Sequence, residues 1–350
     1  MKSNADKLRE LAARARVFLL DMDGTLYLGD TLIGDMRGTL RALRAAGKRA
    51  VYCTNNSSKT AKEYVAKLSR LGLWEEGDLV YTSGMAAAEY IRANHAGKKV
   101  FLVGTDALKE EFSAAGIPLA EEDAEVAVLA YDTTLTYEKL VRINRMIVEG
   151  KPYIATHADD VCPAEGVYPP DAGSFIQLLY RSSGRLPDVV CGKPDTVMGR
   201  FLLARLGARA EEIAMVGDRP YTDMRFGNNN GFYTLLVLSG EAKAEDVPAL
   251  PAGDKPFAVT GSLNDIVPYL HRTQDGPGGA HVCPPPFFPF SRTGGAAAHL
   301  CRGAAVPEGR RAPLFFAGTA LFPALIAGRF FMPEKKSRNK SSRCLDIGRG

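Results

Sequence analysis

The amino-acid sequence predicts an α/β protein built on a doubly wound parallel sheet, with a second α/β domain inserted into it. Three observations support this prediction. Short apolar runs alternate with segments of helical periodicity along most of the chain, as in parallel sheets covered by helices. Several of these runs end in polar residues, which is where open α/β sheets bind their ligands. The chain also holds more strand–helix units than one compact domain requires.

The first elements follow from apolar runs and helix stops. Val17–Leu20 is an apolar run followed by Asp21 and Gly24, which predicts a buried strand that leads into a loop. The segment 37–47 has helical spacing and ends at a glycine, and 49–53 reads as the next strand. Residues 62–71 again place apolar side chains at helical intervals.

The alternation continues to about residue 238. We predict strands at 100–103, 125–130, 152–156, 189–191, 213–216 and 235–238, and a helix at 139–149. Part of this stretch is therefore expected to form the inserted domain.

Composition and charge indicate a soluble globular protein, with 46% hydrophobic and 24% charged residues. The formal charge of +4 is uneven, because residues 273–350 hold 11 Lys/Arg against 4 Asp/Glu and residues 1–272 hold 33 against 36. The slightly acidic body argues against a nucleic-acid partner. The six scattered cysteines form no CxxC pair, and the charged N-terminus resembles no signal peptide, so a cytoplasmic location is expected.

Residues 273–350 differ in character from the rest of the chain. They contain Pro and Gly clusters without a sustained period, which predicts a disordered, low-complexity tail that is not part of the globular body. Within it, 312–328 is a run of 17 residues without a charge. A membrane anchor is one interpretation, but the run is short for a bilayer span and a proline interrupts it, so we do not favour one. Another interpretation is that the tail is not native coding sequence.

Two polar motifs follow the first two strands. Asp21 and Asp23 would share the work of a phosphoryl transfer, one as the ionised nucleophile and the other as the proton donor and acceptor. The motif Thr54, Asn55 and Asn56 offers a hydroxyl, amides and backbone N–H groups before a helix, which suits a phosphate. Taken singly, the first could be an ordinary turn and the second a helix cap.

Two further motifs complete the pattern. Lys193, in the sequence Gly-Lys-Pro-Asp, could neutralise both a nucleophile and a phosphoryl group. Asp218 and Asp223 follow another apolar run, and Mg²⁺ prefers such carboxylate ligands together with phosphate and water. Each feature alone has an ordinary surface-turn interpretation. Four of them in the order acid pair, hydroxyl, lysine and acid pair at successive strand ends indicate one site.

These motifs resemble those of the haloacid dehalogenase (HAD) superfamily, specifically its NagD-like, 4-nitrophenylphosphatase-type branch. The resemblance is carried by DMDGTLYLGD (21–30), CTNNSSKT (53–60), GKPD (192–195) and GDRPYTDMRFGNNNG (217–231). It implies that Asp21 is the nucleophile and Asp23 the general acid/base, that Thr54, Asn55 and Asn56 bind phosphate, and that Lys193 stabilises charge. It also implies an Mg²⁺ cofactor held by Asp21, the backbone carbonyl of Asp23, and Asp218, with Asp223 in support.

The resemblance further implies a HAD-like catalytic core at 1–84 and 189–272, with an inserted cap of the C2 type at 85–188 that closes over the site. The stretch from 155 to 173 would select the substrate. His157, where the family more often has Asn, and Asp159 are candidate specificity residues. His157 could either contact the substrate, which we favour, or simply fill the loop.

The implied function is hydrolysis of a small phosphomonoester (a nucleotide, sugar phosphate, phosphoglycolate or similar metabolite). A homo-oligomer is one expectation for the assembly of the chain. A non-hydrolytic phospho-acceptor, a phosphotransferase and a phosphomutase are alternatives that use the same aspartate. The long insertion and the early acid pair argue against a receiver domain. The lack of GxGxxG after the first strand argues against a nicotinamide-dependent oxidoreductase.

Overall fold

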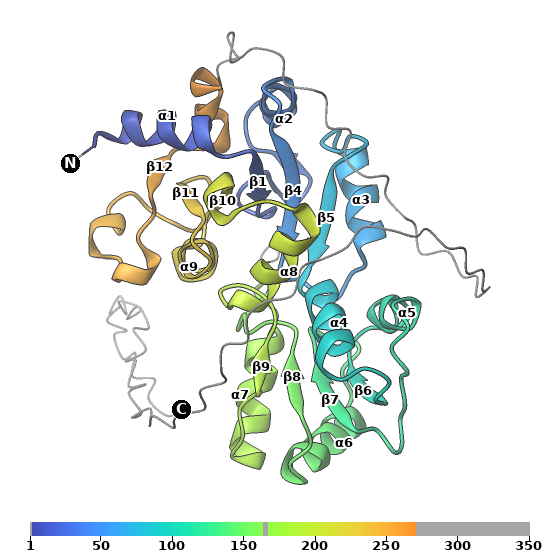
Figure 1. The fold of residues 1–350 in the computed structure, drawn as a ribbon. Coiled ribbons are helices and arrows are strands. Elements are labelled where there is room, and N and C mark those ends of the chain that lie inside the picture. The colour runs from blue at the N-terminus through green and yellow to red at the C-terminus, as the bar shows by residue number, and fades with distance from the viewer. Residues whose placement is uncertain (1, 164–166, 271–350) are drawn as a thin grey trace, which may run out of the picture. The chain divides into compact units, whose positions relative to one another are not determined.

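The computed structural model describes residues 2–163 and 167–270, and its core is a six-stranded parallel sheet in the order β12-β11-β10-β1-β4-β5 (Figure 1). Its strands are β1 (Val17–Leu20), β4 (Arg49–Thr54), β5 (Leu79–Thr82), β10 (Ile213–Gly217), β11 (Tyr233–Val237) and β12 (Ala258–Thr260). The chain winds outward from β1 in both directions, as a doubly wound sheet does. The predicted fold class is confirmed.

The register of the central strands brings the motifs to one edge of this sheet. Leu20 pairs with Val216 of β10 on one side and with Tyr52 of β4 on the other. The residues that follow these three pairing positions therefore leave the sheet side by side at its carboxyl edge. Within β1, Val17 and Leu19 face one apolar cluster and Phe18 and Leu20 face the other, so both faces of the sheet are covered.

Helices cover both faces of the core sheet, and a small hairpin lies beyond β1. The helices are α1 (Asn4–Arg14), α2 (Met36–Ala45), α3 (Ala61–Arg70), α8 (Thr196–Leu206) and α9 (Arg225–Asn229), and the hairpin strands are β2 (Tyr27–Leu28) and β3 (Thr31–Leu32). Helix α3 begins with a capping box, in which Thr60 and Glu63 satisfy each other's backbone N–H groups. This cap fixes the start of α3 directly after the predicted phosphate loop.

The inserted domain has its own four-stranded parallel sheet in the order β6-β7-β8-β9. Its strands are β6 (Val100–Val103), β7 (Val126–Leu129), β8 (Tyr153–Ala155) and β9 (Val189–Val190), and its helices are α4 (Ser83–Asn94), α5 (Asp106–Ala114), α6 (Tyr137–Val148) and α7 (Ala172–Ser183). Figure 1 shows this smaller sheet set apart from the core sheet. The structure thus has the expected inserted α/β cap.

The predicted boundary between cap and core needs a correction. We expected the run at 189–191 to begin the second half of the core, but Val189 and Val190 pair with Ile154 and Ala155 of the cap sheet. Lys193 therefore enters the site from the end of a cap strand rather than a core strand. Periodicity identifies a buried strand but carries no information about which of two parallel sheets it joins.

Helix α4 connects the two domains. It packs against α8 of the core and α5 of the cap, and its residues Ala87 and Ile91 belong to an apolar cluster that also contains Val51 of the core and Val128 of the cap. No helix among the described residues is long and apolar enough to cross a bilayer. The predicted tail at 273–350, with its 312–328 apolar run, lies outside the described residues.

Candidate active site

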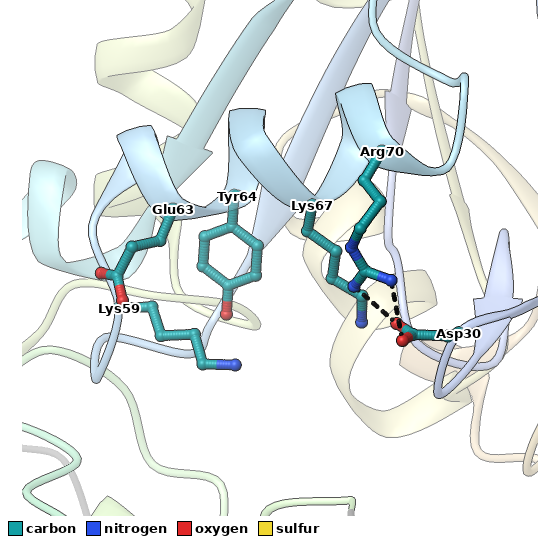
Figure 2. A pocket seen from close by; sticks show the side chains of 6 residues that line it. All are labelled: Asp30, Lys59, Glu63, Tyr64, Lys67 and Arg70. Carbon is teal, nitrogen blue, oxygen red and sulfur yellow. Dashed lines mark hydrogen bonds and ion pairs between the residues drawn. The ribbon is translucent and has the colours of Figure 1, made fainter.

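The first two predicted catalytic acids follow β1 at the carboxyl edge of the core sheet. Asp21 is only 3% exposed, and its backbone N–H continues the ladder to β10 with a 2.9 Å hydrogen bond to the Val216 carbonyl. The side chain of Asp23 is 48% exposed, with the Lys67 ammonium 4.0 Å from its carboxylate. Figure 2 shows Lys67 reaching out from α3. Burial raises the pKa of Asp23 although Lys67 opposes the effect, and a raised pKa suits a proton donor.

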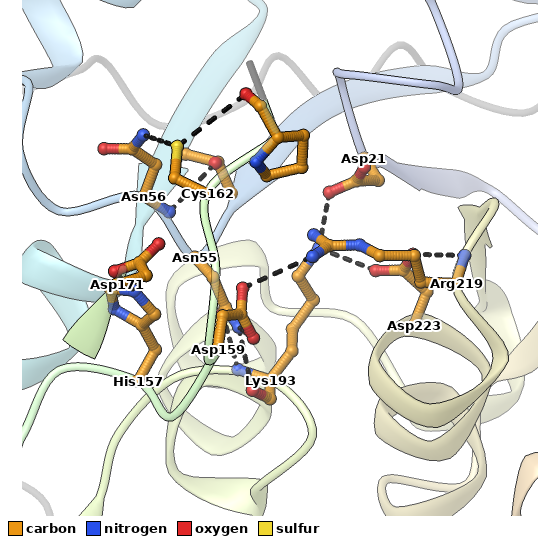
Figure 3. Close-up of polar contacts among 12 residues, drawn as sticks. Asp21, Asn55, Asn56, His157, Asp159, Cys162, Asp171, Lys193, Arg219 and Asp223 are labelled. Atoms are coloured by element: carbon orange, nitrogen blue, oxygen red, sulfur yellow. Dashed lines mark hydrogen bonds and ion pairs between the residues drawn. The ribbon is translucent and has the colours of Figure 1, made fainter. Parts of the chain in front are cut away.

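Lys193 joins the first motif to the last (Figure 3). Its side chain is fully buried, with Nζ 2.6 Å from Asp21 Oδ1 and 2.7 Å from Asp223 Oδ1. Nζ also lies 3.3 Å from the Cys53 carbonyl oxygen. Burial alone would lower the pKa of Lys193, but the two carboxylates more than offset it and raise the pKa. The lysine is therefore held as a cation against the predicted nucleophile.

The predicted phosphate loop follows β4 beside this lysine. Thr54 Oγ1 accepts a hydrogen bond from the Asn56 N–H at 3.1 Å, which forms a tight turn. The Asn55 side chain accepts from the Lys193 N–H at 2.8 Å and donates to the Lys193 carbonyl at 2.9 Å. The Asn56 amide oxygen accepts from the Ser58 N–H at 2.9 Å. Asn55 thus fixes the backbone of Lys193, a role that its predicted phosphate contact did not anticipate.

Three carboxylates meet at this edge of the sheet and could hold a metal ion. Oxygens of Asp21, Asp218 and Asp223 lie within 4.8 Å of one another. The carboxylate of Asp23 is not in this group. Gly24, with φ of +85°, closes the turn at a point where a Cβ would collide with the carboxylate of Asp218.

The chemistry of this donor set fits a divalent cation. Oδ1 of Asp218 is buried and has no hydrogen-bond partner, while Oδ2 accepts from the Glu241 N–H at 2.8 Å. Burial and the charges of Asp21 and Asp223 raise the pKa of Asp218. A buried carboxylate oxygen without a partner lowers the stability of the folded protein. As a ligand of Mg²⁺, this oxygen would gain a partner. Both oxygens of Asp223 are occupied, one by Lys193 and the other by the Arg219 N–H at 3.2 Å, so Asp223 supports the site.

The site also contains the charged side chain of Arg219, which was not among the residues predicted from the sequence. Its guanidinium lies 3.5 Å from Asp159 of the cap, and both side chains are about one-eighth exposed. Burial alone would lower the pKa of Arg219, but the carboxylates around it, Asp21 and Asp159 foremost, raise it. Because Arg219 follows Asp218 directly within the fourth motif, its position at a strand end was the signal that could have identified it.

The two candidate specificity residues have different surroundings (Figure 3). His157 is fully buried, with Nε2 2.8 Å from Asp171 and Nδ1 3.0 Å from the Thr156 hydroxyl. With both ring nitrogens occupied, His157 is placed to fix the loop from inside, in contrast to the substrate contact that we expected. Asp159 does face the site, because it accepts a 3.0 Å hydrogen bond from the Asn55 amide in addition to its contact with Arg219.

Comparison with known proteins agrees with this geometry. A haloacid dehalogenase-like hydrolase family model matches residues 18–118, and a HAD-hydrolase-like model matches 190–266. Phosphoglycolate phosphatase 2 of Arabidopsis thaliana is 33% identical, with 75% of this chain and 96% of that protein covered.

Two solved structures are also similar. The 4-nitrophenylphosphatase of Thermotoga maritima has a TM-score of 0.71 and 39% identity, with 76% of this chain and 99% of that chain covered. The glycerol phosphate phosphatase of Mycobacterium tuberculosis in complex with magnesium has a TM-score of 0.67 and 29% identity, with 73% and 78% covered. The chain therefore belongs to the haloacid dehalogenase-like hydrolases, in their NagD-like, 4-nitrophenylphosphatase-type branch.

Proposed function

We propose that this HAD-type phosphatase hydrolyses small phosphomonoesters in a magnesium-dependent reaction, through an aspartyl-phosphate intermediate on Asp21. The observation that carries the proposal is the position of the Lys193 ammonium, fully buried and 2.6 Å from Asp21 Oδ1. A cation held there keeps the nucleophile ionised and offsets the negative charge of an approaching phosphate. The names of the similar phosphatases support the same class of substrate.

The chemistry has two steps that the residues divide between them. An oxygen of Asp21 attacks phosphorus while the ester P–O bond breaks, and Asp23 gives its proton to the departing alcohol oxygen. Asp23 then takes a proton from water as that water attacks phosphorus, which releases phosphate and restores the Asp21 carboxylate. The half-exposed side chain of Asp23 suits this exchange. The hydroxyl of Thr54 would bind a phosphate oxygen.

Asp21, the backbone carbonyl of Asp23, and Asp218 would hold Mg²⁺, with Asp223 in support. The ion, when bound, would supply positive charge to the phosphate oxygens. Asn55 holds the backbone of Lys193, whose ammonium would add to this positive charge.

Hydrolysis is favoured over stable phosphorylation because an acid/base residue stands beside the nucleophile. A phospho-acceptor needs no such group, whereas Asp23 is placed to activate water. Phosphotransferases and phosphomutases would also phosphorylate Asp21 in the first step. They differ from a hydrolase because they pass the phosphoryl group to an organic acceptor instead of water. A cytoplasmic location and possible homo-oligomers stay predictions.

The test is phosphate release from 4-nitrophenyl phosphate by the wild type, Asp21→Asn and Asp106→Asn, with Mg²⁺ or with EDTA. Asp106 is an exposed acid of α5 and serves as the matched control. We expect metal-dependent turnover that Asp21→Asn lowers at least about a thousandfold and Asp106→Asn leaves unchanged. A folded wild type that becomes phosphorylated on Asp21 without turnover would instead identify a phospho-acceptor.

A further inference from the structure

A pocket of about 250 Å³ lies on one face of α3, next to Asp23. Figure 2 shows the side chains of Lys59 and Lys67 extending from the same side of α3 and of the loop before it. The lining residues are Asp30, Lys59, Glu63, Tyr64, Lys67 and Arg70. Its volume is enough for a small polar substituent and too small for a macromolecule.

The carboxylates of this pocket are already engaged by other groups. Asp30 accepts two hydrogen bonds of 2.9 Å from the guanidinium of Arg70, so these two charges cancel. Glu63 is turned toward the start of α3, where it accepts from the Thr60 N–H at 2.7 Å. Neither Asp30 nor Glu63 therefore forms a close ion pair with Lys59 or Lys67, the two lysines of the pocket.

The two ammonium groups are available to a ligand. Within the described part of the chain, no carboxylate forms an ion pair with Lys59, which is exposed. The Lys67 ammonium lies 3.8 Å from the centre of the Tyr27 ring, a contact that holds it in place, and its nearest carboxylate is Asp23 at 4.0 Å. Two cations beside one small pocket favour an anion.

The pocket also lies where the reaction would place the alcohol part of the substrate. The departing oxygen receives its proton from Asp23, so the rest of the leaving group begins at Asp23. Tyr64, a buried residue that lines the pocket, lies near Thr54 of the predicted phosphate loop. A group attached to the departing oxygen would therefore start close to Lys67, whose ammonium lies 4.0 Å from the Asp23 carboxylate.

We propose that Lys59 and Lys67 form an anion subsite for the leaving group. The preferred substrates are then phosphomonoesters whose alcohol part carries a carboxylate or a second phosphate close to the ester oxygen. This inference rests on the proposed function and narrows it, because an uncharged alcohol part such as glycerol or 4-nitrophenol offers neither lysine an anionic group.

The test compares three substrates that share a two-carbon frame. 2-Phosphoglycolate carries a carboxylate, ethylene glycol bisphosphate carries a second phosphate, and 2-hydroxyethyl phosphate is neutral at the same position. The measured quantity is the ratio of kcat/KM for each anionic substrate to kcat/KM for 2-hydroxyethyl phosphate. We expect a wild-type ratio of at least about ten for one or both anionic substrates, and the one with the larger ratio identifies the preferred anion.

The variants are Lys59→Met, Lys67→Met and Lys67→Arg, with Lys62→Met as the matched control, since Lys62 is exposed on α3 outside the pocket. Each methionine in the pocket should lower the ratio about tenfold, whereas Lys67→Arg and Lys62→Met should keep it. Because a ratio cancels any loss common to all substrates, a partly misfolded variant does not imitate the effect. A wild-type ratio near one, or ratios that the methionines leave unchanged, overturns the subsite. Loss of turnover on every substrate by the wild type would overturn the proposed function itself.

Discussion

At the scale of single residues, Lys193 is the side chain on which both stability and catalysis depend. It is fully buried between Asp21 and Asp223, so Lys193→Met would leave two buried carboxylates facing each other. Removing one partner of such a cluster costs about 3–5 kcal/mol. We expect that loss in urea unfolding measured in EDTA, together with loss of phosphatase activity. The double variant Lys193→Met/Asp223→Asn should recover stability but not activity, and recovery of both would contradict the catalytic role.

The identities of the central residues could be predicted from the sequence, but their partners could not. The order of the motifs was enough to predict the family and the class of enzyme, and both are confirmed. The hydrogen bonds of Asn55 to the Lys193 backbone join residues 138 positions apart, and no local pattern encodes them. The hydrogen bond between His157 and Asp171 likewise joins residues 14 positions apart and could not be predicted from a local pattern.

At the scale of elements, cap helix α5 is joined to the start of core helix α3. Thr105, which caps α5, donates to the Ser58 carbonyl at 2.9 Å, and the carboxylate of Glu111 in the same helix lies near the backbone of Ala61. Oε2 of Glu111 is buried without a partner. Burial raises the pKa of Glu111 to about 7. This contact is therefore sensitive to pH.

We expect Glu111→Gln to stabilise the protein at pH 8. An acid with a raised pKa in the folded state keeps its proton where the unfolded chain has lost it, so wild-type stability falls as the pH rises from about 4.5 to about 7. Glutamine does not titrate, and the variant should gain about 1–2 kcal/mol over the wild type at pH 8 but nothing at pH 4. Urea unfolding at both pH values measures the difference. A gain of equal size at both would show that the carboxylate charge is not the cause.

Four of the six core strands, β1, β4, β10 and β11, were predicted because each contains a run of apolar residues. Strands β5 and β12 were not predicted. The assignment of strands to sheets was not predictable. Val189 and Val190 join the cap sheet through pairing with β8, and pairing between segments separated by a helix depends on the packing of the whole domain. The position of Arg219 against a cap carboxylate depends on the same long-range packing.

At the scale of the whole catalytic unit, Asp159 ties the cap loop to two parts of the core. It accepts from Asn55 at 3.0 Å and lies 3.5 Å from the guanidinium of Arg219. We expect Asp159→Asn to lower kcat/KM for 4-nitrophenyl phosphate about tenfold, because a weakened ion pair leaves the loop less firmly held over the site. Amide hydrogen exchange over 155–163 should be faster in the variant. The neighbouring exposed acid provides the control, Asp160→Asn, and equal effects of the two changes would argue against the tie.

The order of strands in the core sheet also has a consequence for how the chain is made. Strand β1 is paired on one side with β10, so Val17 finds its partner Ile213 only after almost two hundred further residues have left the ribosome. The cap sheet, by contrast, pairs its strands in the order of synthesis, and its contacts are more local. The insertion is thus complete before the centre of the catalytic sheet can close. Until Ile213 emerges, the edge of β1 that pairs with β10 stays unpaired. We expect the nascent chain to be prone to aggregation during that interval.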